Sequence, residues 1–210
     1  MIKLVCFDFD GTIADTFDYS HSVINQLAKE YKFRKVSPEE FLALKQKSKT
    51  EIIQTLKIPL LKVPRVLMKV NEAMNNALDK VAPHNDIPQI LAELNAQQYH
   101  LVSLSNMSNS KVRQFLNKHK MPYFDAIETA SEHADKSYKF RQMVKQCRWP
   151  GQQVYYIADE VRDIATAEKA GTHALIVGWG YGENNELKEN AAKQYLATPE
   201  DLLQFCLSLQ

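Results

Sequence analysis

The chain has 210 residues, of which 45% are hydrophobic and 24% charged. This content supports a buried core and excludes a disordered chain or a coiled coil. Its 26 basic and 25 acidic residues leave a net charge of +1, so no strong field indicates a nucleic acid or an anionic membrane as partner.

The sequence also points to a location. No apolar run approaches the roughly 20 residues that span a bilayer. Two aspartates occur before a signal-peptide core could be complete. The three cysteines are widely spaced and form no CxxC motif, which favours a reduced compartment. We therefore expect a cytoplasmic protein.

The first part of the chain predicts one strand and then a block of helices. Residues 2–7 are nearly all apolar, as in a strand buried on both faces of a parallel sheet. Residues 16–81 are helical in pattern, and Ser37-Pro38-Glu39-Glu40 predicts a helix start. Apolar residues spaced by three and four from Leu60 to Val81 predict one long amphipathic helix, with Pro64 in its first turn.

From residue 83 onward, predicted helices and strands alternate. Strands are expected at 100–104, 126–129, 154–158 and 174–177, with helices between them and a last helix capped by Thr198. This order predicts an α/β fold: a doubly wound, Rossmann-like parallel sheet with an inserted all-helical domain. We expect the core domain to comprise residues 1–15 and 83–210, and the helical domain residues 16–82.

Polar clusters follow the carboxyl ends of three predicted strands. They consist of Asp8, Asp10 and Thr12, of Ser105 and Asn106, and of Asp159 and Asp163. Ligands bind outside these strand ends in open α/β sheets, so we expect the clusters to share one edge. Four carboxylates brought together would need a hard cation, and oxygen ligands suit Mg²⁺. No HExxH or HxH spacing indicates zinc.

The string D-x-D-G-T at residues 8–12, placed where a strand ends, resembles the phosphatases of the haloacid dehalogenase superfamily. The match continues, in the family's order, through Ser105, a lysine near position 136, and Asp159 with Asp163. The sequence IADEVRDI at 157–164 is also similar to that family. WGYG at 179–182 and TPEDL at 198–202 are similar to its phosphoglycolate phosphatase-like members, whose cap domain the helical insertion resembles.

This resemblance implies a Mg²⁺-dependent hydrolase of small phosphomonoesters that works through an aspartyl phosphate. Asp8 would be the nucleophile and Asp10 the general acid and base. Ser105 and Lys136 would stabilise the phosphoryl group, with Thr12 and Asn106 nearby. The metal ligands would be Asp8, Asp10 through its backbone carbonyl, Asp159 and Asp163, the last directly or through water.

The sequence departs from the family pattern in a few places. The family usually has Lys-Pro, whereas both Lys136 and Lys139 lack a following proline. Lys136, 23 residues before Asp159, has the usual separation and is favoured, while Lys139 stays open. Ala158 and Glu160 replace a usual glycine and a usual small residue. We expect the Glu160 side chain to point to solvent.

The helical domain is expected to select the substrate. The basic segment 45–51 lies between two predicted helices, and its Lys47 and Lys49 are candidates to hold a carboxylate or second phosphate. A solvated basic turn explains them equally well. The expected partner is a small phosphorylated metabolite, and the expected assembly is a monomer or a homodimer. A β-phosphoglucomutase-like mutase, or a non-catalytic binding or regulatory protein on the same scaffold, remains an alternative.

Overall fold

The computed structural model describes residues 4–44, 47–130, 136–146, 153–160, 162–180 and 195–209. The chain splits into two compact units, one of Met1–Asp15 with Ala82–Gln210 and the other of Thr16–Val81. No described helix is long and apolar enough to cross a membrane.

The first unit is built on a parallel sheet. In the described part of the chain the sheet has six strands in the order β3-β2-β1-β4-β5-β6, and every pairing is parallel. The strands are β1 (Leu4–Phe7), β2 (His100–Ser105), β3 (Phe124–Thr129), β4 (Val154–Ala158), β5 (His173–Val177) and β6 (Tyr195–Leu196). This arrangement confirms the predicted α/β class. It also adds β6, which the sequence pattern did not predict.

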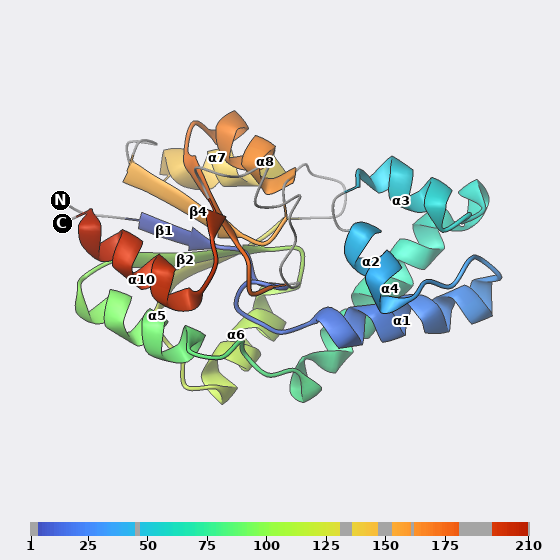
Figure 1. Cartoon of the computed structure of the whole chain (residues 1–210), viewed down its shortest axis with the longest axis horizontal. Coiled ribbons are helices and arrows are strands. Elements are labelled where there is room, and N and C mark those ends of the chain that lie inside the picture. Colours follow the sequence, from blue (N-terminus) through green and yellow to red (C-terminus); the bar gives the residue numbers. More distant parts are fainter. Residues whose placement is uncertain are drawn as a thin grey trace. The chain divides into compact units, whose positions relative to one another are not determined.

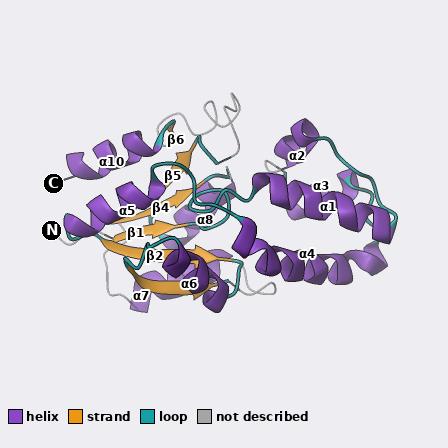
Figure 2. Ribbon diagram, turned by 90° about the horizontal axis from the view of Figure 1, so that it is seen from below, coloured by secondary structure: helices purple, strands orange, loops and turns teal. Residues whose placement is uncertain are grey.

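Helices cover both faces of the sheet. Helices α7 (Lys136–Gln146) and α8 (Arg162–Ala170) lie on one face (Figure 1). The other face carries α5 (Ile87–Ala96), α6 (Asn109–Lys118) and α10 (Pro199–Ser208), which stand in front of the sheet in Figure 2. The predicted cap of α10 is present, because the Thr198 and Asp201 side chains each accept a hydrogen bond from the other's backbone N–H.

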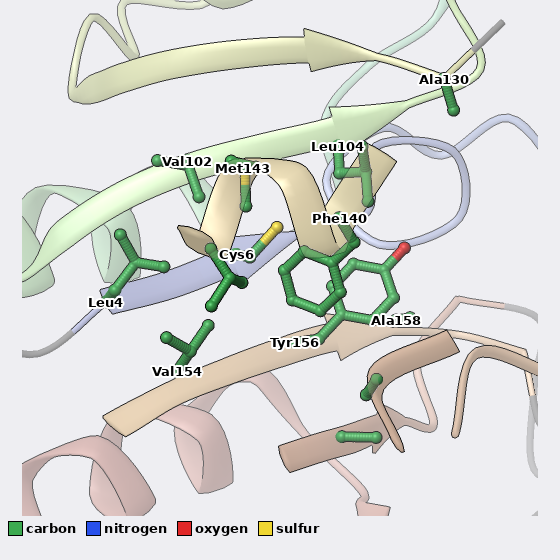
Figure 3. Close-up of a cluster of buried hydrophobic side chains, with 13 residues drawn as sticks. Leu4, Cys6, Val102, Leu104, Ala130, Phe140, Met143, Val154, Tyr156 and Ala158 are labelled. Atoms are coloured by element: carbon green, nitrogen blue, oxygen red, sulfur yellow. The ribbon is translucent and has the colours of Figure 1, made fainter. Parts of the chain in front are cut away.

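Strand β1 lies inside the sheet, between β2 and β4. All four residues of β1 are buried, as expected for a strand that packs against helices on both sides. One core cluster, between the sheet and the α7 and α8 side, includes Leu4, Cys6, Phe140 and Tyr156 (Figure 3). The chain continues from β1 to β2 and β3 on one side, then returns with β4 on the other. The strand order therefore reverses between β1 and β4, where ligands bind in folds of this type.

The second unit is helical throughout its described residues. It contains α1 (Phe17–Tyr31), α2 (Pro38–Leu44), α3 (Lys49–Thr55) and α4 (Val63–Ala77), with 3₁₀ turns at Leu60–Lys62 and Leu78–Lys80. Helix α1 packs on α4. The predicted start of α2 is confirmed, because Glu40 N–H donates to Ser37 Oγ and Ser37 N–H donates to Glu40 Oε2.

The prediction of a single helix from Leu60 to Val81 is wrong. A 3₁₀ turn precedes α4, and another follows it. Pro64 does lie in the first turn of α4, where its missing N–H costs nothing. The predicted apolar face is only partly buried: Leu60 is 82% exposed and Leu67 47%, whereas Met74 is buried. The spacing of the apolar residues predicted a helix, but it did not predict where the helix ends or which of these residues are buried.

Candidate active site

Three predicted site residues lie at the carboxyl ends of neighbouring strands. Asp8 follows β1, Ser105 ends β2 and Asp159 follows β4, and β1 lies between the other two strands. Asp8 N–H donates to the Ile157 carbonyl at 2.8 Å, which ties the end of β1 to β4. Asp8, Ser105 and Asp159 are 8%, 0% and 4% exposed. The parallel sheet thus brings these buried polar groups to one edge.

The loop after β1 holds the Asp8 carboxylate. Phe9 N–H donates to Asp8 Oδ1 at 2.7 Å. Gly11 has a φ of 77°, which glycine adopts without steric cost, and its N–H donates to the Ala14 carbonyl at 2.9 Å. The N–H groups of Ile13 and Ala14 both donate to the Phe9 carbonyl. The backbone of this tight turn therefore fixes one oxygen of Asp8.

Lys136 supplies a cation to this edge. Its Nζ lies 2.6 Å from Asp8 Oδ2 and 3.5 Å from Asp163 Oδ1. Burial lowers the pKa of Lys136, but the Asp163 and Asp8 carboxylates outweigh this effect and raise the pKa above its ordinary value. Lys139 instead pairs with Glu128 at 2.8 Å, and both side chains are about one-third exposed. Of the two lysines that the sequence left open, Lys136 is the one beside Asp8.

The segment after β5 packs against the loop after β1. Thr12 Oγ1 lies 3.4 Å from Asp159 Oδ1, and the Trp179 indole N–H donates to the Thr12 carbonyl at 3.1 Å. A Cβ atom on Gly180 would lie 2.1 Å from the Gly11 carbonyl oxygen. This contact could not be predicted from the sequence, because no local pattern shows that residues 179–180 return to residues 11–12.

Asp163 is a buried carboxyl in the first turn of α8. It is 3% exposed, and its Oδ2 has no hydrogen-bond partner among the described residues. Burial raises the pKa of Asp163 to about 7; Lys136 opposes this change, while the negative charges of Asp8 and Glu160 add to it. Burial makes the ionised form of this carboxyl costly, and a cation or a metal-bound water beside it would offset that cost.

The prediction that Glu160 points to solvent is wrong. Its side chain is only 10% exposed, and its carboxylate pairs with the Arg162 guanidinium. Burial lowers the pKa of Arg162, but Glu160 and Asp163 raise it by a larger amount. The extra negative charge beside Asp159 therefore carries its own counter-ion, two residues further along the chain.

Asp10 and Asn106 complete the predicted residues at this edge. Asp10 is half-buried, and its backbone bridges to Ala14. Asn106 is exposed in the bend after β2. Ser105 Oγ accepts a hydrogen bond from Met107 N–H at 2.9 Å, so the bend curls around the serine. The structure thus places a hydroxyl, an amide and several carboxylates around the same strand ends.

Lys47 and Lys49 belong to the helical unit. Lys47 Nζ donates to Thr55 Oγ1 at 3.4 Å. Lys49 is the first residue of α3, which Ser48 caps. The expectation that 45–51 is a loop between helices is therefore wrong for its second half, because the Ser48–Glu51 capping box starts the helix there. Residues 45–46 lie outside the described residues.

The chemistry of this edge fits Mg²⁺, although the four predicted carboxylates do not form a cage. In the described part of the chain, no three His, Cys, Asp or Glu side chains are grouped to hold a metal ion. The Lys136 ammonium lies between Asp8 and Asp163 instead. Mg²⁺ needs only one or two carboxylates, because water and phosphate complete its octahedron. Asp163 Oδ2, which has no hydrogen-bond partner within the described ranges, leaves an acceptor for such a water.

The sequence is similar to known proteins along most of its length. The family model for haloacid dehalogenase-like hydrolases matches residues 5–177. A phosphoglycolate phosphatase of Synechococcus elongatus is 25% identical over 204 residues, which cover 97% of this chain and 96% of that protein.

Solved structures share the whole fold. One is described as a predicted phosphatase from Clostridium acetobutylicum; it has a TM-score of 0.84 at 18% identity and covers 99% of both chains. A haloacid dehalogenase-like family hydrolase from Streptococcus pneumoniae has a TM-score of 0.83 at 19% identity, covering 97% of this chain and 98% of the other.

Proposed function

The chain belongs to the haloacid dehalogenase-like hydrolases, and we propose that it is a Mg²⁺-dependent phosphatase of small phosphomonoesters that works through an aspartyl phosphate. One observation carries this proposal: the buried Asp8 carboxylate has the Lys136 ammonium 2.6 Å from one oxygen, and it follows β1, the neighbour of the strand β4 that Asp159 follows. The similarity to a phosphoglycolate phosphatase makes phosphoglycolate the first natural substrate to test.

Asp8 is the proposed nucleophile. One oxygen of the Asp8 carboxylate attacks phosphorus, the bond from phosphorus to the ester oxygen breaks, and Asp10 donates a proton to the leaving alkoxide. Asp10 then takes a proton from the water that attacks the aspartyl phosphate, which releases inorganic phosphate and restores Asp8. Lys136 offsets negative charge on Asp8 and the phosphoryl oxygens, and Ser105 donates a hydrogen bond to one of those oxygens.

The metal would be held by the same strand ends. Asp8, Asp159 and the backbone carbonyl of Asp10 would ligate Mg²⁺, and Asp163 would hold it directly or through water. When bound, Mg²⁺ offsets the charge of the phosphate and of the surrounding carboxylates.

We assign the helical unit the role of a cap that selects the substrate. Lys47 and Lys49 precede or begin α3, and their ammonium groups would suit a substrate with a second anionic group. The preferred substrate would then carry a carboxylate or a second phosphate in addition to the ester.

Hydrolysis of para-nitrophenyl phosphate tests the proposal. Wild-type protein should release nitrophenol only with Mg²⁺, and Asp8→Asn should lose this activity. Asp125→Asn is the matched control, because Asp125 is an exposed carboxylate on β3 that pairs with His100. Equal rates in Asp8→Asn and wild type would refute the proposed nucleophile. Interconversion of hexose phosphate isomers without phosphate release would favour the mutase instead.

A further inference from the structure

Tyr156 is a buried polar residue to which the proposed mechanism gives no role. It lies in β4, three residues before Asp159, and is 0% exposed. A phenylalanine would fill nearly the same space without burying a hydroxyl, and a buried hydroxyl costs free energy unless it finds a partner. The hydroxyl does find one: it lies 3.5 Å from Asp163 Oδ1.

The ring of Tyr156 has a second contact at the same site. The Lys136 ammonium lies 5.3 Å from the ring centroid, within the range of a cation–π interaction. Phe140 lies one helical turn after Lys136 on α7, and its ring centroid is 4.9 Å from that of Tyr156. In Figure 3 the Phe140 and Tyr156 rings pack together, and the tyrosine hydroxyl points toward the carboxyl ends of the strands.

These contacts join Tyr156 to Asp163 and to Lys136, the cation that pairs with Asp8. Asp163 Oδ1 is shared between the Lys136 ammonium and the Tyr156 hydroxyl, each at 3.5 Å. Asp163 Oδ2 has no hydrogen-bond partner among the described residues. Tyr156 therefore engages one carboxylate oxygen and leaves the other for a cation or its water.

We infer that Tyr156 is a positioning residue of this active site: its ring orients the Lys136 ammonium toward Asp8, and its hydroxyl holds the Asp163 carboxylate in the orientation that would hold Mg²⁺ or a water bound to it. This inference rests on the proposed function and adds to it. Tyr156 acts through Lys136 and Asp163. Outer partners of metal-binding groups tune affinity in this way.

Two substitutions separate the two contacts. Tyr156→Phe removes the hydroxyl but keeps the ring, whereas Tyr156→Leu removes both. The matched control is Tyr155→Phe, because Tyr155 precedes Tyr156 on the same strand and its side chain points to the opposite face. The Tyr155 ring packs on His173 and Phe205 instead.

The first measurement is Mg²⁺ binding by titration calorimetry on the intact protein without substrate. We expect Tyr156→Phe to weaken Mg²⁺ binding about 3- to 10-fold, which is at or below the lower end of the effects for outer partners of metal ligands, because the hydrogen bond that it removes is long. Tyr155→Phe should bind Mg²⁺ like wild type. Equal affinities for Tyr156→Phe and wild type would overturn the role of the hydroxyl.

The second measurement is turnover of para-nitrophenyl phosphate at saturating Mg²⁺. Tyr156→Leu should lose about 10-fold or more in kcat with little change in KM, because Lys136 loses the surface that orients it. Tyr156→Phe should restore most of that kcat. A purely structural role would lower the melting temperature of Tyr156→Leu but leave its kcat unchanged below melting, and this result would overturn the role of the ring.

The binding and turnover measurements also distinguish this inference from the proposed function. If wild type binds Mg²⁺ but hydrolyses no ester, the proposed function fails and the calorimetry still decides the role of the hydroxyl. If wild type binds no Mg²⁺, both proposals are overturned.

Discussion

Replacing Asp163 with asparagine should stabilise the metal-free protein at alkaline pH. Asp163 is 3% exposed, and burial raises its pKa from 3.8 to about 7; Lys136 opposes the change and Asp8 adds to it. Asparagine has nearly the same shape and no charge. The substitution therefore removes a carboxylate whose burial in ionised form costs free energy in the metal-free protein.

The sign of the effect follows from the raised pKa. The Asp163 carboxyl contributes stability below about pH 4, and this contribution is lost as the pH rises toward 7. A shift of about 3 pKa units corresponds to an upper limit of about 4 kcal/mol at pH 8. With roughly 2–4 °C per kcal/mol for a chain of this size, Asp163→Asn should melt several degrees above wild type in EDTA at pH 8. The difference should shrink toward pH 4.

Thermal unfolding followed by circular dichroism provides the measurement, in EDTA and then in Mg²⁺. Mg²⁺ should raise the melting temperature of wild type but raise that of Asp163→Asn much less. Asp125→Asn is the control, because that carboxylate is exposed. An Asp163→Asn variant less stable than wild type at pH 8 in EDTA would refute the reasoning, since it would show that the ionised carboxylate stabilises the fold.

Three further substitutions test other parts of the structure. Lys136→Met leaves the buried Asp8 carboxylate without its cation. It should therefore lower the free energy of unfolding at pH 8 by about 2–4 kcal/mol, measured by urea titration. Unchanged stability would contradict the buried ion pair. Gly180→Ala places a Cβ 2.1 Å from the Gly11 carbonyl oxygen, so kcat should fall about 10-fold or more, and a wild-type rate would show that this contact is not needed. Lys32→Gly relieves a left-handed residue, φ 56°, at the end of α1 and should raise stability by about 0.5–1 kcal/mol in the same titrations; a loss would contradict that conformation.

Most of the core fold could be predicted because each element has its own local signal. Buried parallel strands are continuous apolar runs, and capped helices follow them, as at Thr198. Strand β6 was missed because two residues, Tyr195 and Leu196, are too few for any period to show. A local pattern also does not show where a helix begins and ends. The apolar spacing from Leu60 to Val81 therefore predicted one helix, whereas the chain forms a 3₁₀ turn, α4 and a second 3₁₀ turn.

The sequence predicts the site residues that lie at or directly after the ends of strands. Asp8, Ser105 and Asp159 meet because parallel strands end on the same edge, which needs only strand order. Contacts that depend on helix docking could not be predicted. Tyr156 meets Lys136 only because α7 packs on β4 in one register, and no spacing in the sequence shows this.

The charge of Glu160 also illustrates this limit. Its position suggested exposure, since most glutamates are exposed. In the structure the turn into α8 lets Arg162 reach back to it, and the side chain is 10% exposed. The sequence places Arg162 two residues after Glu160 but does not show that the two side chains meet.

The most direct test of the account is to detect the phosphoryl group on Asp8. Protein turning over para-nitrophenyl phosphate in Mg²⁺ is quenched in acid, digested and analysed by mass spectrometry. Wild type should give a phosphorylated peptide containing Asp8, and Asp10→Asn should accumulate more of it, because the water that hydrolyses the intermediate loses its base. Asp8→Asn should give none. Undiminished turnover in Asp8→Asn, or phosphate found on another residue, would contradict the proposed chemistry.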